Sequence, residues 1–381
     1  MTSPSLRNGL LTCSVCLLLI GANVLRGETA RPQDARAHAA TGLASPEKIV
    51  QYMRDRYKVP ESVKVTAEPL RNSQFPYFLQ TIVATDNGKE KRANNVFITK
   101  DGRCFVLGNL FALREGSTSE IIRCVREATK LPAQTELKIG PFEATPNPQL
   151  LKSVITASDG KNTQTAMIFI TKDRRTGILG IVLPFGEDYV RSMIKTKGVP
   201  SQGPSNAPVT LVEYADLQCP GCARLHEYIE KQLLPKYGDK VRVIFKEFLI
   251  PGHDWSATAA LANECAYQIK PSAFPGYRTL IFASQNAINA SNVRELLLGL
   301  GNDAGLERST LAACIDSKAS LSRVEAARQE GKDLGVIKTP TTFVNGRIIV
   351  GLASQATFDK IVDEALLART KTGTGARNPT P

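Results

Sequence analysis

The stretch Val209-Thr-Leu-Val-Glu-Tyr-Ala-Asp-Leu-Gln-Cys-Pro-Gly-Cys222 decides the fold of this chain. Its part up to Asp216 is apolar and rich in β-branched residues, which predicts a buried strand. Apolar residues then recur on one helical face from Leu225 to Leu233, and Gly238 ends that helix. A second apolar run, Val241-Arg-Val-Ile-Phe245, predicts the next strand. The region is therefore expected to be a β-α-β unit whose helix begins at a Cys-x-x-Cys pair.

The position of the pair gives its two cysteines different properties. Pro220 suits the first helical position, so Cys219 stands at the helix N-terminus. The unpaired backbone N–H groups there favour a thiolate over a thiol. We therefore expect Cys219 to be the exposed nucleophile and Cys222, one turn further, to be the buried resolving thiol. Thiol–disulfide exchange by such a pair needs no metal or organic cofactor.

A structural zinc site is the rival chemistry for a cysteine pair. Zinc normally takes four ligands, often from a second Cys-x-x-Cys pair or from two histidines. The chain has three histidines, and its other Cys-x-x-Cys pair, Cys13 and Cys16, lies in the apolar N-terminal segment. The sequence therefore favours redox chemistry without a bound metal.

Residues 209–370 resemble the thioredoxin-fold DsbA-like thiol:disulfide oxidoreductases, close to the BdbD-type subgroup. The resemblance rests on the stretch that ends at Cys222 and on Thr339-Pro-Thr-Thr-Phe-Val-Asn-Gly346, with a helical segment at about 254–330 between them. It implies an α/β thioredoxin-like domain with an inserted helical segment. Thr339 and Pro340 match the family's cis-proline loop, beside which an extended substrate segment pairs with the backbone.

The resemblance also implies roles for residues around the cysteine pair. Glu213 stands where thioredoxin-like proteins place a buried acid, and burial would raise its pKa and suit it to exchange protons with Cys222. A glutamate at a strand end that reaches solvent is the alternative. Pro220 and Gly221 tune the redox couple, and they lack the histidine found in strongly oxidising members. Thiolate stabilisation is therefore expected to come mainly from the helix end.

Cys265 and Cys314 match a second, non-catalytic disulfide that some DsbA-like proteins carry in the helical segment. An oxidising compartment favours this bond, and two unpaired core thiols are the alternative. His226 is expected to be a surface or packing residue. His253 matches a loop position where relatives often carry histidine, and a role near the active site stays open. Trp255 is expected to be a core anchor.

The chain between Ser45 and Asp188 repeats itself at an offset of 72 residues. Matching stretches are Met53–Pro60 with Val125–Pro132, Val96–Asp101 with Ile168–Asp173, and Leu107-Gly108 with Leu179-Gly180. Each copy begins with helical spacing and continues with alternating strands and turns. We expect two tandem small α+β modules, 45–115 and 116–196, followed by a linker at 197–208. The modules resemble the N-terminal dimerisation domain of DsbC-type disulfide isomerases, which implies a homodimer or a pseudo-dimer within one chain.

Cys104 and Cys124 are not duplicated in the repeat, since Thr176 and Tyr52 stand at the matching positions. Buried free thiols are the expected state, and a bond between the two is the second option.

The N-terminus indicates the compartment. An apolar run from Leu10 to Ala22 follows Arg7 and predicts a signal segment over residues 1–30, with an uncleaved anchor as the alternative. A linker at 31–44 and a disordered tail at 371–381 are expected. The 48 Lys and Arg against 36 Asp and Glu give a net charge of +12, but these residues are scattered, which argues against nucleic-acid binding. The protein is therefore expected to be periplasmic or otherwise extracytoplasmic.

The sequence predicts a thiol:disulfide oxidoreductase that acts on folding secreted proteins and exchanges electrons with a membrane oxidase or reductase. The DsbA-like domain favours an oxidase, whereas the tandem modules favour an isomerase or reductase. A chaperone-like binding protein that grips unfolded clients is a further alternative.

Overall fold

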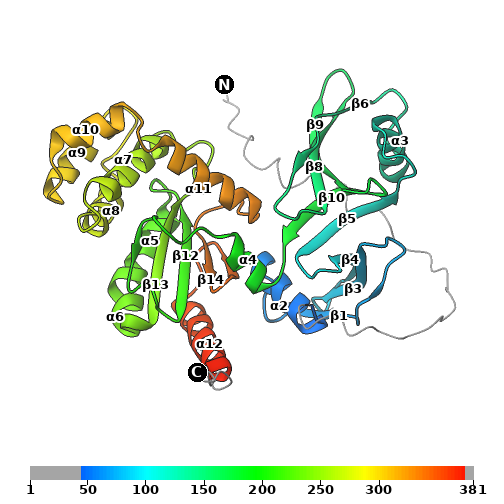
Figure 1. The fold of residues 1–381 in the computed structure, drawn as a ribbon, viewed down its shortest axis with the longest axis horizontal. Coiled ribbons are helices and arrows are strands. Elements are labelled where there is room, and N and C mark those ends of the chain that lie inside the picture. The colour runs from blue at the N-terminus through cyan, green and yellow to red at the C-terminus, as the bar shows by residue number, and fades with distance from the viewer. Residues whose placement is uncertain (1–43, 374–381) are drawn as a thin grey trace, which may run out of the picture. The chain divides into compact units, whose positions relative to one another are not determined.

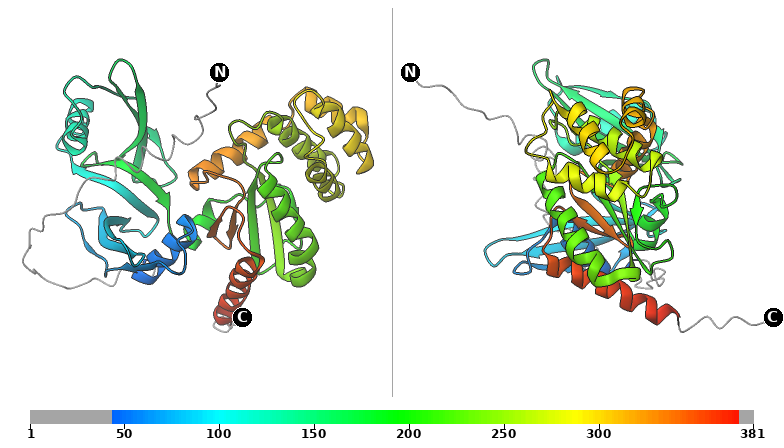
Figure 2. Two further views of the ribbon diagram at one scale, coloured as in Figure 1. Left: turned by 180° about the vertical axis from the view of Figure 1, so that it is seen from behind. Right: turned by 90° about the vertical axis from the view of Figure 1, so that its left-hand side faces the viewer.

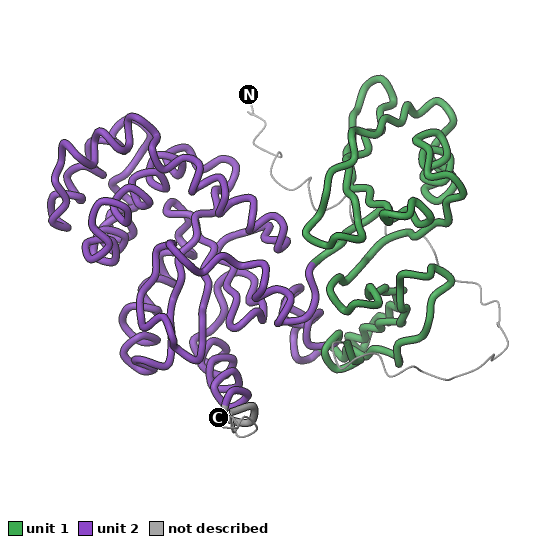
Figure 3. The backbone as a smooth tube through the Cα atoms, in the orientation of Figure 1, with its two compact units in different colours: residues 1–49, 63–183 green, residues 50–62, 184–381 purple. Residues whose placement is uncertain are grey.

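The computed structural model describes residues 44–373 (Figure 1 and Figure 2). These residues form two compact units, coloured separately in Figure 3. Unit 1 contains residues up to Ile49 and Val63–Leu183, and unit 2 contains Val50–Ser62 and the chain from Pro184 onward. Among these residues, no helix has both the length and the apolar character to cross a bilayer. The predicted signal segment, with Cys13 and Cys16, lies outside the described residues.

Unit 1 is built from the two repeats, each of which contributes five strands. The strands of the first repeat are β1 (Lys64–Ala67), β2 (Arg71–Asn72), β3 (Phe78–Asp86), β4 (Lys91–Thr99) and β5 (Cys104–Ala112). Those of the second are β6 (Glu136–Ile139), β7 (Glu143–Ala144), β8 (Leu150–Ser158), β9 (Thr163–Thr171) and β10 (Thr176–Pro184), preceded by helix α3 (Thr118–Thr129). The two sets merge into one ten-stranded sheet in the order β1-β3-β4-β5-β10-β9-β8-β6, with β2 on β3 and β7 on β8.

The two repeats meet where β5 lies beside β10. Gly108 and Gly180, which the repeat pairs at its offset of 72, face each other at this seam with φ of +150° and +157°. One apolar core crosses it, because Phe97 and Val106 of the first repeat cluster with Phe169 and Ile178 of the second. Unit 1 is therefore a single body formed by both repeats.

Helix α3 is the helix that was expected at the start of the second repeat. The Ser117 side chain caps its first turn by accepting from the Glu120 N–H at 3.3 Å. Ile121 and Val125 point into a core formed with strands of the second repeat. Cys104 and Cys124 are buried free thiols that belong to different clusters, so the structure shows no bond between them.

Helix α2 (Pro46–Tyr57), the counterpart of α3 in the first repeat, behaves differently. From Val50 onward its residues belong to unit 2. Arg56 donates to the backbone carbonyl oxygen of Leu334 at 3.4 Å, and Asp55 lies 2.7 Å from Arg347. Most of this helix therefore belongs to unit 2 and not to the module to which the repeat assigned it.

Unit 2 contains a five-stranded sheet and most of the helices. The elements before the inserted segment are α4 (Glu187–Met193), β11 (Ser201–Gln202), β12 (Val209–Ala215), α5 (Pro220–Tyr228), a π-helical turn (Ile229–Leu233), α6 (Leu234–Tyr237), a 3₁₀ turn (Gly238–Lys240) and β13 (Val241–Glu247). The inserted helices are α7 (Ser256–Ile269), α8 (Phe274–Ala283), α9 (Val293–Asp303), α10 (Arg308–Asp316) and α11 (Leu321–Asp333). The chain ends with β14 (Thr341–Val344), β15 (Arg347–Val350) and α12 (Gln355–Gly373).

The sheet of unit 2 has the order β11-β13-β12-β14-β15, with β12 parallel to β13 and antiparallel to β14. One face packs against α5 and α12, through residues such as Leu225 and Phe358. The other face packs against α4 and the chain after α11, through residues such as Val190 and Leu334. This is the thioredoxin-like α/β layering that the sequence predicted.

Three predicted boundaries differ from the structure. Unit 1 ends at Leu183 rather than near residue 196, because Val190 of α4 and Ile194, which follows that helix, pack into the core of unit 2. The segment 197–208, predicted to be a linker, contains β11, which pairs with β13. Helix α12 continues to Gly373, because Ala, Leu, Arg and Lys extend a helix well until that glycine, so residues 371–373 of the predicted tail are helical.

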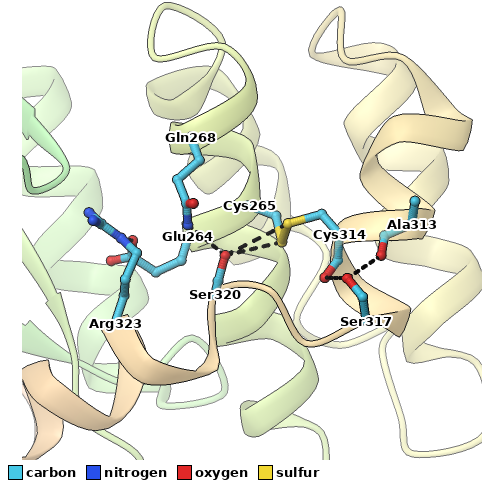
Figure 4. The surroundings of a disulfide bond; sticks show 8 residues. All are labelled: Glu264, Cys265, Gln268, Ala313, Cys314, Ser317, Ser320 and Arg323. Atoms are coloured by element: carbon cyan, nitrogen blue, oxygen red, sulfur yellow. Dashed lines mark hydrogen bonds and ion pairs between the residues drawn. A yellow bond between two sulfur atoms is a disulfide. The ribbon is translucent and has the colours of Figure 1, made fainter.

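The inserted helices carry a disulfide between Cys265 of α7 and Cys314 of α10 (Figure 4). The hydroxyl group of Ser320, at the start of α11, lies 3.2 Å from the sulfur of Cys265. Trp255 is buried in the same core as Cys265. The disulfide thus links α7 and α10, the helices that precede and follow α8 and α9.

The seam of unit 1 is testable by adding one methyl group. A β-carbon at Gly108 would lie 2.8 Å from the α-carbon of Gly180, and one at Gly180 would lie 2.7 Å from that of Gly108. We expect Gly108→Ala and Gly180→Ala each to lower the free energy of unfolding by about 1–3 kcal/mol, as overpacking does. Gly140→Ala is the control, since its β-carbon would make only an ordinary contact at 3.5 Å. Denaturant unfolding that ranks all three variants alike would contradict this packing.

Candidate active site

Cys219 stands at the start of α5, directly after the loop that leaves β12. Its φ and ψ of −78° and 120° are extended, and its carbonyl oxygen accepts from the N–H groups of Cys222 at 3.0 Å and Ala223 at 3.2 Å. These bonds form the first turn of the helix, so the side chain of Cys219 projects from a helix N-terminus. Cys219 is partly exposed, whereas Cys222 is fully buried.

The chain returns to Cys219 at the Thr339–Pro340 peptide bond, which is cis. The sulfur of Cys219 lies 3.7 Å from the carbonyl oxygen of Thr339. Gly221 keeps this approach open, because a β-carbon there would lie 3.2 Å from the Pro340 ring. The structure thus brings together Cys219, Gly221, Thr339 and Pro340, which the sequence separates by about 120 residues.

The two sulfurs have opposite electrostatic environments. A hydrogen bond from the Cys222 thiol is the largest of the causes that lower the pKa of Cys219 to about 5, and Thr339 and the backbone N–H groups of Cys222 and Gly221 add to it. Burial is the largest cause that raises the pKa of Cys222 well above its usual range, and the charge of Glu213 raises it further. At neutral pH the pair therefore holds one thiolate, on Cys219, and one proton, on Cys222.

Glu213 is fully buried on β12, as predicted, but it has a partner that the sequence did not indicate. Arg278 of α8, itself fully buried, lies 3.2 Å from Glu213 and 3.2 Å from Glu247 of β13. Burial raises the pKa of both carboxyl groups, that of Glu247 to about 7, and the Arg278 charge opposes the rise. The guanidinium group also lies over the rings of Phe245 and Phe282. Two acids thus share one cation at a fully buried position.

Asp216, at the end of β12, holds the loop that carries Cys219. Its buried carboxylate accepts from the N–H groups of Gln218 and Ile250, each at 2.8 Å. The Nδ1 atom of His253 lies 2.9 Å from the same carboxylate. Gln285, in the turn after α8, donates a hydrogen bond of 3.1 Å to the carbonyl oxygen of Cys219. His253, which the sequence left open, therefore lies beside the active-site loop.

Several known proteins are similar to this chain. A family model described as thioredoxin matches residues 195–364. Disulfide bond formation protein D of Bacillus subtilis is 28% identical over 184 residues, which cover 48% of this chain and 83% of that protein. A putative protein-disulfide oxidoreductase of Rickettsia prowazekii is 31% identical over 225 residues, covering 58% of this chain and 78% of that protein. This chain belongs to the DsbA-like thiol:disulfide oxidoreductases. The crystal structure of oxidised BdbD from Bacillus subtilis aligns with 45% of this chain and 95% of its own, at 27% identity and a TM-score of 0.43.

In this DsbA-like protein, the sequence did not indicate the site residues that come from the inserted helices. Arg278 lies on an amphipathic stretch, and only its charge on the buried face of α8 could have drawn attention. His226 is a buried packing residue, one of the two options expected for it, with its Nε2 atom 2.9 Å from the Thr279 hydroxyl group, and burial lowers its pKa to about 3. Within residues 44–373, no group of three or more His, Cys, Asp or Glu side chains is arranged to bind a metal ion.

The ionisation of Cys219 predicts a change in proton uptake near pH 5. Below that pH, reduction of the disulfide should take up two protons, and above it only one, because Cys219 then stays a thiolate. The reduction potential should therefore fall by about 59 mV per pH unit below pH 5 and about 30 mV above it. Measuring the potential from pH 4 to pH 8 checks this. A constant slope of about 59 mV throughout would show that Cys219 is a thiol at neutral pH.

The same lowered pKa makes the reduced protein sensitive to acid. A thiol whose pKa is lower in the folded state stabilises that state above its unfolded pKa, and this stability is lost as the pH falls toward 5. The oxidised protein has no such thiol and should not share this loss.

Arg278 is expected to be essential for stability in this DsbA-like protein. Arg278→Met would leave two buried carboxyl groups without a cation, at a cost of about 3–5 kcal/mol. A folded state that contains a buried acid with a raised pKa loses stability as the pH rises. The loss of stability caused by Arg278→Met should therefore be larger at pH 8 than at pH 5. Urea unfolding at both pH values measures it. Arg294→Met, which removes only exposed ion pairs with Asp316 and Glu295, is the control and should change stability far less. Equal effects of the two variants would contradict the assignment.

Proposed function

We propose that this protein is an extracytoplasmic dithiol oxidase that forms disulfides in folding secreted proteins through Cys219 and Cys222. Glu213 exchanges protons with Cys222, Thr339 and Pro340 hold the substrate segment, and Pro220 and Gly221 tune the couple. The observation that carries the proposal is the partly exposed Cys219 sulfur, with a pKa of about 5, beside the backbone of Thr339. A stabilised thiolate favours the reduced pair and makes the oxidised pair a stronger oxidant.

The exchange proceeds in two balanced steps. A substrate thiolate attacks the Cys219 sulfur of the oxidised pair, the bond between the two active-site sulfurs breaks, and Cys222 leaves and takes up a proton. A second substrate thiolate then attacks the substrate sulfur of the mixed disulfide, and Cys219 leaves as a thiolate. The substrate loses two electrons and gains a disulfide, and the active-site pair gains those electrons. A membrane redox partner would reoxidise the pair.

The buried acids assist the proton transfers of these steps. Cys222 needs a proton when it leaves and must give one up when it is reoxidised. Glu213 is close enough for its charge to affect the pKa of Cys222, and its Oε1 atom has no hydrogen-bond partner among the described residues. Arg278 keeps the pKa of Glu213 from rising as far as burial alone would raise it. Glu213 is therefore suited to act as the donor and acceptor.

An isomerase or reductase is the second candidate, favoured by unit 1. Its ten-stranded sheet joins two repeats of one chain at the Gly108–Gly180 seam, which supports an intrachain pseudo-dimer rather than a homodimer through this unit. A pseudo-dimer within one chain has a single active-site cysteine pair. This arrangement fits a protein with one catalytic domain and one client-binding module. A chaperone-like role would use the same module without the cysteines.

The reduction potential of the Cys219–Cys222 couple distinguishes these functions. We expect a value less negative than about −180 mV, on the oxidising side of protein disulfide isomerase. A value near about −270 mV, like that of thioredoxin, would overturn the oxidase proposal in favour of a reductase. Equilibration with glutathione, followed by thiol labelling of Cys219, gives the measurement.

Two cysteine variants complete this test. Cys219→Ala should abolish oxidation of a reduced protein substrate, and Cys222→Ala should accumulate the mixed disulfide with Cys219. If Cys219→Ala instead retained full protection of an unfolded client against aggregation and oxidation was absent in the wild type, the protein would be a chaperone.

A further inference from the structure

The surface beside the cis-proline turn carries two lysines from distant parts of the sequence. Lys58 follows α2 within unit 2, and Lys338 directly precedes Thr339. The Lys58 ammonium group donates to the carbonyl oxygen of Leu352 at 3.2 Å. A β-carbon built on Gly351 would lie 2.9 Å from the Lys58 nitrogen and 3.6 Å from the ε-carbon of Lys338. Both side chains therefore converge over Gly351.

Gly351 connects these lysines with the active site. Its N–H group donates to the carbonyl oxygen of Pro340 at 2.6 Å. Pro340 adjoins Thr339, whose carbonyl oxygen lies 3.7 Å from the Cys219 sulfur. A substrate segment held along Thr339 would therefore pass next to both ammonium groups.

The positive charge at this place is not balanced by the protein. Within the described chain, neither Lys58 nor Lys338 forms an ion pair with a carboxylate. The acidic groups contributed here by α2 and α12, Asp55 and Glu364, are both paired with Arg347, at 2.7 Å and 2.6 Å. Burial first, and then the charge of Lys338, lower the pKa of Lys58, as expected of two cations held close together. An anion would relieve this repulsion.

An exposed apolar residue directly precedes one of the two lysines in the sequence. Ile337 is 77% exposed, the highest value among the large apolar side chains of residues 44–373. It immediately precedes Lys338 in the loop that leads to the cis-proline. Exposed apolar groups rimmed by charge are typical of protein-binding surfaces.

We propose that Lys58, Lys338 and Ile337 form a specificity subsite that selects substrate segments with an acidic and an apolar residue near the reacting cysteine. The proposal rests on the oxidoreductase function proposed above and adds a substrate class to it. The subsite acts by charge complementarity, which raises the association rate and fixes the position of the segment.

The chain itself does not supply the occupant. Residues 1–43 contain more Arg than Asp and Glu, and residues 374–381 contain one Arg and no acid. A second copy of the chain, with its net charge of +12, would also be repelled. The complementary partner is therefore an acidic segment of another polypeptide.

The test compares two dithiol peptides of equal length, one with Asp-Leu and one with Lys-Leu beside the first cysteine. Second-order rate constants for their oxidation by the oxidised full chain give an acidic-to-basic ratio. We expect Lys338→Glu and Lys58→Glu each to lower this ratio about threefold to tenfold relative to wild type, the size expected for reversing one exposed charge. Dividing the variant ratio by the wild-type ratio cancels the intrinsic reactivity of each peptide.

Lys240→Glu is the matched control. Lys240 is exposed and precedes β13, at the end of the parallel strands opposite to the one that Cys219 follows. Lys240→Glu changes the net charge by the same amount as Lys338→Glu and Lys58→Glu. We expect its acidic-to-basic ratio to stay at the wild-type value. Raising the salt concentration from 0.05 to 0.5 M should reduce the wild-type preference, because the Debye length shortens to a few ångströms.

The outcomes separate the two proposals. If wild-type protein oxidises neither peptide, the proposed function fails. If it oxidises both and the ratio is unchanged in Lys338→Glu and Lys58→Glu, the subsite is wrong while the function stands. If Lys240→Glu lowers the ratio as much as they do, the effect is general charge attraction and the subsite is again wrong.

Discussion

The antiparallel pairing of β14 with β12 is the constraint on which the active site depends. It aligns Tyr214 with Thr341, so that the turn before β14 and the loop after β12 meet at the same end of the sheet. Cys219 thereby reaches the backbone of Thr339 at the point where α5 begins. The helix end supplies N–H groups for the thiolate, and the turn brings the carbonyl oxygen of Thr339 to 3.7 Å from the sulfur. The strand pairing is what brings these two features together.

The inserted helical segment contributes residues to the active site. Arg278 of α8 places a cation between Glu213 and Glu247, which lie on adjacent parallel strands. Two buried carboxylates without it would repel each other and lose hydration, so both would stay protonated over a wide pH range. Gln285, also of the α8 region, binds the carbonyl oxygen of Cys219. The inserted segment therefore affects both the ionisation of the two buried acids and the shape of the loop that carries Cys219.

Unit 1 shows how a repeat becomes a single body. The two copies share a core across β5 and β10, and the paired glycines Gly108 and Gly180 let the backbones approach closely. The repeat is not symmetric in its helices, because α3 packs on its own strands whereas α2 turns to unit 2 through Asp55 and Arg56. The same departure places Lys58 near the cis-proline turn, so a segment that lies between the two parts of unit 1 in the sequence contributes to the surface around the active site.

The sequence by itself determined the β-α-β unit, the position of Cys219 at a helix start and the repeat, since these follow from local periodicity and spacing. The resemblance to thioredoxin-like proteins implied a buried Glu213 but left a glutamate that reaches solvent as the alternative, and the structure decided for burial. The sequence pattern also identified the cis-proline loop through Thr339 and Pro340, because that motif is short and specific. Only the tertiary structure decided the partner of Glu213, the merging of two modules into one sheet and the course of α2. Contacts of that kind join residues far apart in the chain, such as Glu213 with Arg278, and no local pattern encodes which distant charge will fill a buried site.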